Sequence, residues 1–146
     1  MSYAIVEAAA AAVIIKHADY DAENCAQGDY RVVGHGKARA AVLTYGGVVE
    51  EELSLGLLRR RWTVNVDLFV PWPGQEVTWE ANMATEREKI AVQVAAWPKL
   101  DGAANVIAAH LRTGATPIEA ALDRGSYKGQ RLAIEVEEMV SPGRQE

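Results

Sequence analysis

Apolar and polar residues change their spacing several times along the chain, and each change marks a predicted element. The first segment, Tyr3–His17, is rich in alanine, the strongest helix former, and contains neither glycine nor proline. This composition predicts a helix. Because apolar residues occupy nearly every side of it, we expect it to be buried on more than one side, as a central helix or in a contact between subunits.

A polar loop is predicted at Ala18–Asp29, and a β region follows it. Tyr30–Val33 and Ala38–Tyr45 are strand-like, and Gly46-Gly47 closes the second of them. The next segment, Val48–Val70, is predicted to be a long hairpin. Its second arm has the clearest strand pattern in the chain, because apolar side chains alternate with polar ones. The alternating apolar residues of that arm are Trp62, Val64, Val66, Leu68 and Val70.

A change of period after the Pro71–Gly74 turn predicts the second helix, Glu76–Ala96, which ends before Pro98. Asn105–Arg112 fits a short helix or a strand, and we favour the strand. Thr116–Lys128 is expected to be irregular. The remaining segments are a final strand at Gln130–Val140 and a frayed polar tail at Ser141–Glu146.

Strands that are grouped, and do not alternate with helices, indicate an α+β fold with a mainly antiparallel sheet. We expect the N-terminal helix and the long central helix to pack on this sheet, and the β-hairpin to project from it. The chain has 146 residues, which suits one domain covering residues 1–146. It contains no internal repeat and no linker pattern.

The composition is that of an ordinary globular protein, with 49% hydrophobic and 24% charged residues. A formal net charge of −5 disfavours a nucleic-acid-binding surface, because affinity for the phosphate backbone comes from Lys and Arg. The apolar run Ala8–Ile15 is preceded by Glu7 and by no basic residue, unlike a secretory signal. It is also shorter than the ~20 residues that cross a bilayer. We therefore expect a cytoplasmic protein without membrane association.

Motifs that would indicate phosphate or metal binding are incomplete. Gly34-His35-Gly36-Lys37 lacks the other residues of a phosphate loop, because positions 31 and 38 hold Arg31 and Ala38. The acidic loop that begins at Asp19 has Asn24 where a calcium loop requires glycine. We interpret the first motif as a bend between strand segments and the second as a solvated loop.

The remaining candidates for catalysis are also isolated. Cys25 is the only cysteine, and we expect its thiol to be unreactive. The three histidines, His17, His35 and His110, lack the spacing of a zinc site and have no carboxylate motif nearby. Glu135, Glu137 and Glu138 form a carboxylate cluster that an exposed strand edge would explain equally well. We therefore expect no enzyme activity, no cofactor and no metal.

The hairpin carries the most unusual pattern in the chain. With a turn near Gly56, an acidic triplet would face a basic triplet, and each opposite-charge pair would add roughly 0.2–1 kcal/mol. Four leucines surround the turn, so its tip folds onto its own core or docks into a neighbouring chain, and we favour docking. The candidate subunit-interface residues are Glu50, Glu51, Glu52, Leu53, Leu55, Leu57, Leu58, Arg59, Arg60 and Arg61.

Several segments in their order along the chain carry a family resemblance: GDYRVVGHGKARAAVLTYGG, RRRWTVNVDLFVPWPG, VAAWPKLDG and QRLAIEVEE. Their pattern, and the length of the chain, resemble the tail terminator (tail-completion or minor tail) proteins of long-tailed bacteriophages. The resemblance implies a virion protein that forms a hexameric ring, caps the finished tail tube and meets the head–tail connector. Its partners would be copies of itself, the tail tube protein and the connector, with genome DNA passing through unbound. It would assemble in the host cytoplasm.

Two alternatives remain open at this stage. One is another head–tail connector or minor tail protein. The other is a small ligand-binding protein or enzyme with an apolar helix–sheet pocket lined by Trp72, Trp79 and Trp97. Packing of a helix on the sheet explains these tryptophans more simply.

Overall fold

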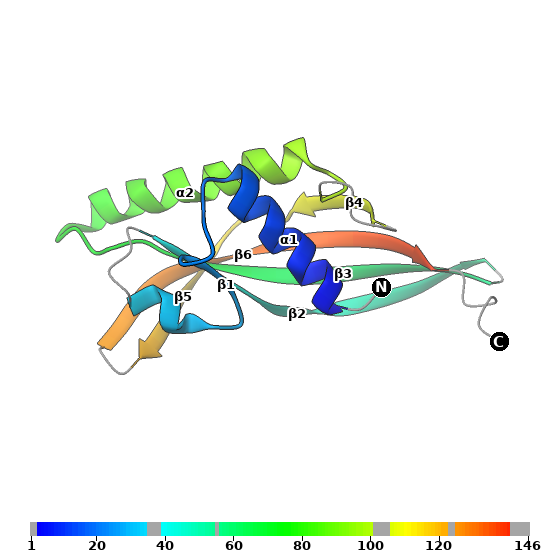
Figure 1. Ribbon diagram of the computed structural model, residues 1–146, viewed down its shortest axis with the longest axis horizontal. Coiled ribbons are helices and arrows are strands. Elements are labelled where there is room, and N and C mark those ends of the chain that lie inside the picture. Colours follow the sequence, from blue (N-terminus) through cyan, green and yellow to red (C-terminus); the bar gives the residue numbers. More distant parts are fainter. Residues whose placement is uncertain (1–2, 35–38, 55, 101–105, 123–124, 141–146) are drawn as a thin grey trace.

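A computed structural model describes residues 3–34, 39–54, 56–100, 106–122 and 125–140 (Figure 1). Its elements are, in chain order, α1 (Tyr3–His17), β1 (Cys25–Gln27), the 3-10 helix η1 (Tyr30–Gly34), β2 (Ala40–Ser54), β3 (Leu57–Phe69), α2 (Glu76–Ala96), β4 (Val106–Leu111), β5 (Thr116–Leu122) and β6 (Gly125–Val140). Neither helix has the combination of length and hydrophobicity required to cross a membrane, over the residues just given.

All strands belong to one six-stranded sheet in the order β1-β2-β3-β6-β4, and β5 also pairs with β6. β1 runs parallel to β2, and every other pairing is antiparallel. The predicted α+β fold with a mainly antiparallel sheet is thereby confirmed. β3 lies in the middle of the sheet, where β6 pairs with it from Leu58↔Val140 to Phe69↔Gly129.

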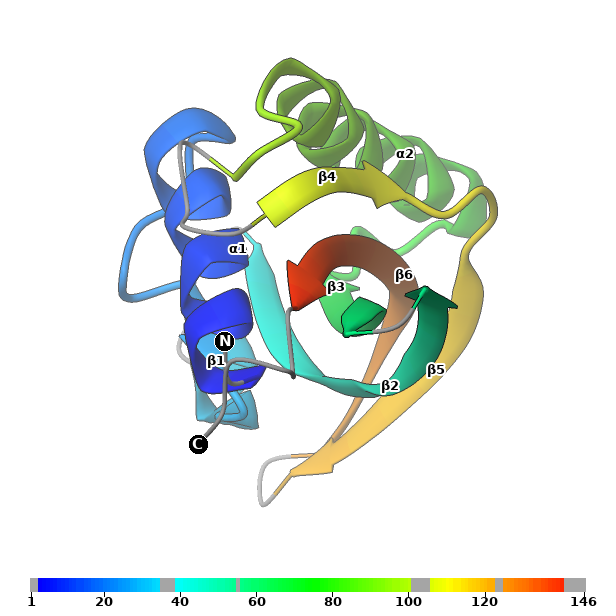
Figure 2. The ribbon, with the colours of Figure 1, turned by 90° about the vertical axis from the view of Figure 1, so that its right-hand side faces the viewer.

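β4 and β5 cover the other edge of β6 in two consecutive pieces. β4 pairs with the C-terminal half of β6, and β5 pairs with its N-terminal half. Gly114 lies between the two strands and has φ = 92°, a backbone conformation that residues other than glycine rarely adopt. Glycine therefore lets the chain bend there. Figure 2 looks along the molecule and shows how strongly the sheet curls, with α1 and α2 outside the curl on neighbouring sides.

Both helices cover one face of the sheet, and the main core lies between them. Alternate residues of β3 supply its centre, because Val64, Val66 and Leu68 are fully buried on that face. Met83 and Ile90 of α2 are likewise fully buried. A second, smaller cluster lies on the opposite face, where η1 packs over β2 and β3. It consists of Val32, Ala40, Val42 and Phe69.

Both predicted helices and the strand favoured within Asn105–Arg112 are found, although Asn105 itself lies outside the described residues. The predicted strand at Tyr30–Val33 is wrong, because these residues form η1. The side chain of Asp29 accepts a hydrogen bond from the Arg31 N–H at 3.0 Å, which favours a turn over an extended chain. The predicted loop before it also contains β1.

The predicted end of a strand at Gly46-Gly47 is also wrong, because β2 continues through the glycines to Ser54. The register shifts between Tyr45 and Val48, and a Cβ on Gly46 would lie only 2.7 Å from the Thr63 Cγ2. Glycine therefore permits a β-bulge here and does not end the strand.

The prediction that Thr116–Lys128 is irregular is wrong as well. β5 and the first residues of β6 pair across this segment, from Thr116↔Arg131 to Leu122↔Gly125. Pro117 is tolerated because β5 pairs on one side only. The predicted tail at Ser141–Glu146 and the residues 35–38 of the glycine motif lie outside the described part of the chain.

Truncating the core should destabilise the protein far more than an equal change at its surface. Ile134 on β6 is fully buried, whereas Ile107 on β4 is 43% exposed. We expect Ile134→Ala to lower the free energy of unfolding by about 2–5 kcal/mol, because it removes packed methyl groups and leaves a cavity. Ile107→Ala should lower it by less than about 0.5 kcal/mol. Urea denaturation followed by circular dichroism measures both, and equal losses would contradict the assigned core.

Candidate interaction surface

Nine of the ten predicted interface residues lie at one end of the sheet, and Leu55 lies outside the described residues. Glu50, Glu51, Glu52 and Leu53 end β2, and Leu57, Leu58, Arg59, Arg60 and Arg61 begin β3. The chain reverses near Gly56, whose φ of 77° favours glycine. Figure 1 shows this end of β2 and β3 at one end of the long axis, away from the start of α2.

The strand register brings part of the two charged triplets together. Glu50 lies opposite Arg60 and Glu51 lies opposite Arg59. Their ion pairs measure 3.0 Å from Arg60 Nε to Glu50 Oε1 and 2.5 Å from Arg59 Nη2 to Glu51 Oε2. The glutamate side chains of these pairs are exposed to solvent, so each pair contributes modestly to stability.

The third expected pair does not form. Glu52 lies opposite Leu58, and Arg61 lies opposite Val49. Arg61 instead pairs across β3 and β6, where its Nη2 lies 3.2 Å from Glu137 Oε1. The cause is the register of the hairpin, which sets Glu50 opposite Arg60 and so offsets the two triplets by one residue.

β3 is flanked by β6 as far as Leu58, which lies opposite Val140. The basic residues therefore belong to a middle strand of the sheet. The leucines near the turn differ in exposure, because Leu57 and Leu58 are half-buried and Leu53 is 43% exposed.

The outer edge of β2 is the largest open strand edge of this end. β1 covers only Ala41–Leu43, so the stretch Thr44–Ser54, here named the β2 edge, has no strand partner on its outer side within the described residues. Its exposed apolar side chains are Tyr45 (54%), Val48 (36%), Val49 (63%) and Leu53 (43%). Unpaired backbone groups beside exposed apolar side chains form a template for another strand.

A buried carboxylate supports this end of the sheet from within. Glu138 on β6 is 1% exposed, and its Oε1 accepts a hydrogen bond from Trp62 Nε1 at 2.8 Å. Arg60 Nη1 lies 3.3 Å from the same oxygen. Arg60 is thus held between Glu138 and Glu50, which restrains the charged end of the hairpin.

The other members of the predicted carboxylate cluster also pair with cations. Glu135 accepts a hydrogen bond from Arg112 Nε at 2.7 Å, and His110 Nε2 lies 3.4 Å from its other oxygen. The Arg112 guanidinium is the main reason that the pKa of Glu135 is lowered from its usual value. β6 is paired on both sides, so the alternative interpretation as an exposed strand edge is wrong.

The lone thiol is buried, as an unreactive residue should be. Burial raises the pKa of Cys25 to about 12, which disfavours the nucleophilic thiolate at neutral pH. The acidic loop makes a local turn, because Asp21 Oδ1 accepts hydrogen bonds from the Glu23 and Asn24 N–H groups. No group of three or more potential metal ligands occurs in the part of the chain that the structure describes.

The tryptophans do not share a pocket. Trp79 is buried in the core, and Trp97 is half-buried with its ring stacked 4.2 Å from His17. Trp72 is 55% exposed, and Lys128 lies over its ring. Core packing therefore explains Trp79 and Trp97, and Trp72 belongs to the surface.

Two buried ionic clusters were missed by the sequence analysis. Asp67 on β3 is fully buried, and its carboxylate accepts a bidentate pair of hydrogen bonds from Arg131 at 2.7 and 2.9 Å. It also accepts a hydrogen bond from the Tyr30 hydroxyl. Asp67 is one of the polar residues that alternate with the apolar ones along β3, and this alternation predicts a side chain that faces solvent. The only available signal was its position amid strongly apolar neighbours.

The second cluster joins the loop after α1 to α2. Glu86 is 8% exposed and accepts a hydrogen bond from the Tyr20 hydroxyl at 2.9 Å. Arg39 Nε lies 3.3 Å from Glu86, and its guanidinium stacks on the Tyr20 ring. Lys89 completes the neutralisation at 3.2 Å. These contacts anchor a loop and expose no reactive group.

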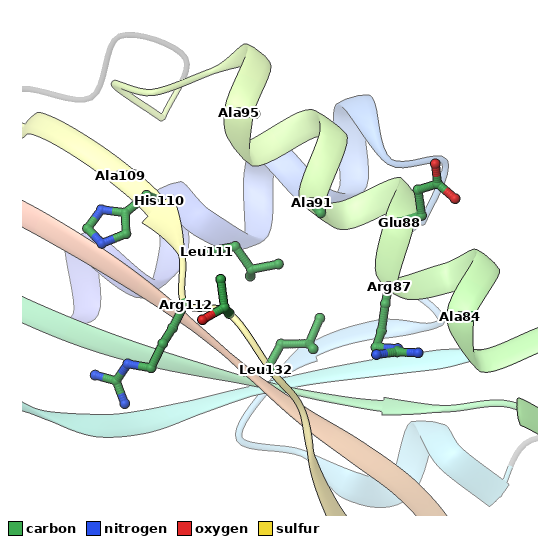
Figure 3. Close-up of a pocket in the computed structure, with 12 residues that line it drawn as sticks. Ala84, Arg87, Glu88, Ala91, Ala95, Ala109, His110, Leu111, Arg112 and Leu132 are labelled. Carbon is green, nitrogen blue, oxygen red and sulfur yellow. The ribbon is translucent and has the colours of Figure 1, made fainter.

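A groove of about 580 Å³, here named the α2 groove, runs between α2 and the bend that joins β4 to β5 (Figure 3). Its lining residues are Ala84, Arg87, Glu88, Ala91, Ala95, Ala109, His110, Leu111, Arg112, Thr113, Gly114 and Leu132. Three alanines of α2 form one wall, so the groove is mainly apolar. It contains none of the tryptophans.

The sequence matches no protein-family model, and no curated protein matches it.

The acid sensitivity of folding should depend on Arg112. Because the folded pKa of Glu135 is lowered, this carboxylate contributes stability above its unfolded pKa and loses it as the pH falls through the folded pKa. We expect Arg112→Ala to lower the free energy of unfolding at pH 7 by less than about 1 kcal/mol, since Arg112 is half exposed. Below about pH 4.5, the free energy of unfolding of the variant should fall less steeply with decreasing pH than that of the original protein.

Urea denaturation at a series of pH values measures this effect. Lys128→Ala serves as the control, because its partner Glu76 is half exposed and 3.7 Å away. An unchanged slope in Arg112→Ala would show that Arg112 does not govern the titration of Glu135.

Proposed function

We propose that this protein is a structural virion subunit that assembles with copies of itself into a ring. The ring, with hexameric stoichiometry, would cap the phage tail tube, end its polymerisation and join the tail to the head connector. The observation that carries the self-assembly is the β2 edge, which is long, unpaired in the described structure and apolar. Proteins usually shorten, charge or cover such edges to avoid association.

The charge pattern of the β2 edge favours a head-to-tail contact. A two-fold pairing of edges centred on Glu51 would set one acidic triplet against the other, and like charges directly opposite each other are destabilising. A contact with a different surface avoids this repulsion. Contacts between two different surfaces generate rings when the rotation closes.

The resemblance to tail terminators supplies the place of the ring in the virion. Its partners would be the tail tube protein on one side and the head–tail connector on the other. A net charge of −5 suits a ring through which genome DNA passes without being bound. Assembly would take place in the host cytoplasm, and the finished protein would reside in the tail of the virion.

Another head–tail connector or minor tail protein is the alternative within the same class, and the same β2 edge supports it. A small ligand-binding protein or enzyme is the alternative of another class, and the α2 groove is the observation that favours it. The groove has few polar groups that converge on a common point, which favours the assembly proposal.

Charges introduced on the β2 edge should dissociate the assembly without unfolding the subunit. We expect Val49→Asp with Leu53→Asp to convert the oligomer into monomer, because both side chains are exposed and would be desolvated only at an interface. Val77→Asp is the matched control, since Val77 is 78% exposed at the start of α2. Light scattering coupled to size exclusion measures the mass, and circular dichroism checks the fold.

Imaging of tails assembled without this protein tests the proposed role in ending tail polymerisation. Removal of a terminator should give tail tubes of uncontrolled length in negative-stain images, and adding the protein back should restore one length. A protein that remains monomeric at high concentration and is not recruited by tail extract would contradict the ring. Tubes of normal length without a head would instead favour the connector.

A further inference from the structure

We propose that the α2 groove receives the end of the β2 edge, Glu52–Leu53, of a second copy of this chain. The inference rests on the proposed self-assembly and names the surface on which the neighbouring subunit docks. The groove and the β2 edge lie on different parts of the molecule, so the contact is head-to-tail (Figure 1).

The wall of the groove leaves room for an incoming side chain. Ala84, Ala91 and Ala95 occupy the side of α2 that borders it, and Leu111 and Leu132 provide apolar surface opposite (Figure 3). A volume of about 580 Å³ exceeds that of one leucine side chain, so the groove can bury Leu53 together with part of its neighbours.

The backbone of β4 offers an edge beside this groove. The Arg112 N–H points to β6, where it donates to the Ala133 carbonyl at 2.8 Å, and the Ala109 N–H points the other way, to the Pro98 carbonyl at 2.5 Å. Alternate residues of a strand face the same side, so the Leu111 N–H also points away from β6. β4 has no strand on this side among the described residues, and Pro98 already occupies it at Ala109, so an added extended segment would pair near Leu111.

Arg87 gives the groove its charge preference. Its side chain reaches from α2 toward Leu132 (Figure 3), and its Nε is buried without a hydrogen-bond partner among the described residues. The other charged side chains of the lining turn elsewhere, because His110 and Arg112 point away from α2 and Glu88 points away from Leu132. A half-buried guanidinium that forms no ion pair among the described residues favours a carboxylate.

The end of β2 supplies the matching groups. Glu50 and Glu51 are engaged by arginines of their own chain, whereas Glu52 lies opposite Leu58 with no ion pair in the described part of the structure. Leu53 follows it and is 43% exposed. The register shifts between Glu52 and Ser54, and such a shift interrupts strict alternation, so Glu52 and Leu53 need not point to opposite faces.

A charge exchange tests the contact between Glu52 and Arg87. We expect Arg87→Glu and Glu52→Arg each to raise the dissociation constant of self-association roughly tenfold or more, because each sets like charges against each other. The double variant should restore association to near its original strength. Lys99→Glu is the control, since Lys99 is an exposed cation outside the groove, and it should leave association unchanged. A dilution series followed by sedimentation velocity measures the constants, and circular dichroism checks the fold.

Filling the groove is an independent test that changes no charge. Ala91→Trp should weaken association to a similar degree, whereas Asn82→Trp, on an exposed part of α2 away from the groove, should not. If Arg87→Glu and Ala91→Trp leave association unchanged while Val49→Asp with Leu53→Asp abolishes it, the docking site is overturned and the proposed self-assembly stands. A double charge variant that stays dissociated overturns the pairing of Glu52 with Arg87. A native protein that is monomeric throughout overturns both proposals.

Discussion

The pairing of β3 with β6 is the constraint on which the rest of the structure depends. It runs from Leu58↔Val140 to Phe69↔Gly129 without a register shift and supplies the apolar surface that both helices cover. Its register is fixed by charge as well as by hydrophobicity, because Asp67 lies directly opposite Arg131. A slip of two residues would leave the fully buried carboxylate of Asp67 without its guanidinium, and removing one partner of a buried ion pair costs about 3–5 kcal/mol.

This central pairing decides which surfaces remain for partners. With β3 and β6 in the middle, β2 lies toward one margin of the sheet and β4 with β5 at the other. β1 pairs only with the first part of β2, so the acidic and apolar half of β2 has no outer strand partner among the described residues. On the other margin, the bend at Gly114 lets β4 leave the line of β5 and lie beneath α2, with the α2 groove between them. Two different surfaces thus lie on one molecule, which is what the proposed head-to-tail assembly requires.

Local chemistry predicted the elements whose signals are strong. α1 and α2 are found with the predicted bounds, because alanine content marks α1, and an apolar period between flanking prolines marks α2. The opposition of Glu50 and Glu51 to Arg60 and Arg59 could also be predicted, since a hairpin is a local structure. The predictions failed where a distant partner decides the conformation. Thr116–Leu122 has a weak strand pattern of its own and becomes β5 because β6 offers an edge to pair with.

The sequence by itself therefore determined the α+β class, both helices, the alternating strand β3 and the charged hairpin. Only the tertiary structure decided that Arg61 pairs with Glu137, that Glu138 is buried against Trp62, and that the outer side of Thr44–Ser54 meets no strand in the described part of the chain. The reason is distance along the chain. Neighbouring residues of one helix or strand leave a periodic pattern in the sequence, whereas the hydrogen bond between Trp62 and Glu138 joins residues 76 positions apart. Whether a side chain on such a strand is buried, paired or open depends on which strand lies beside it.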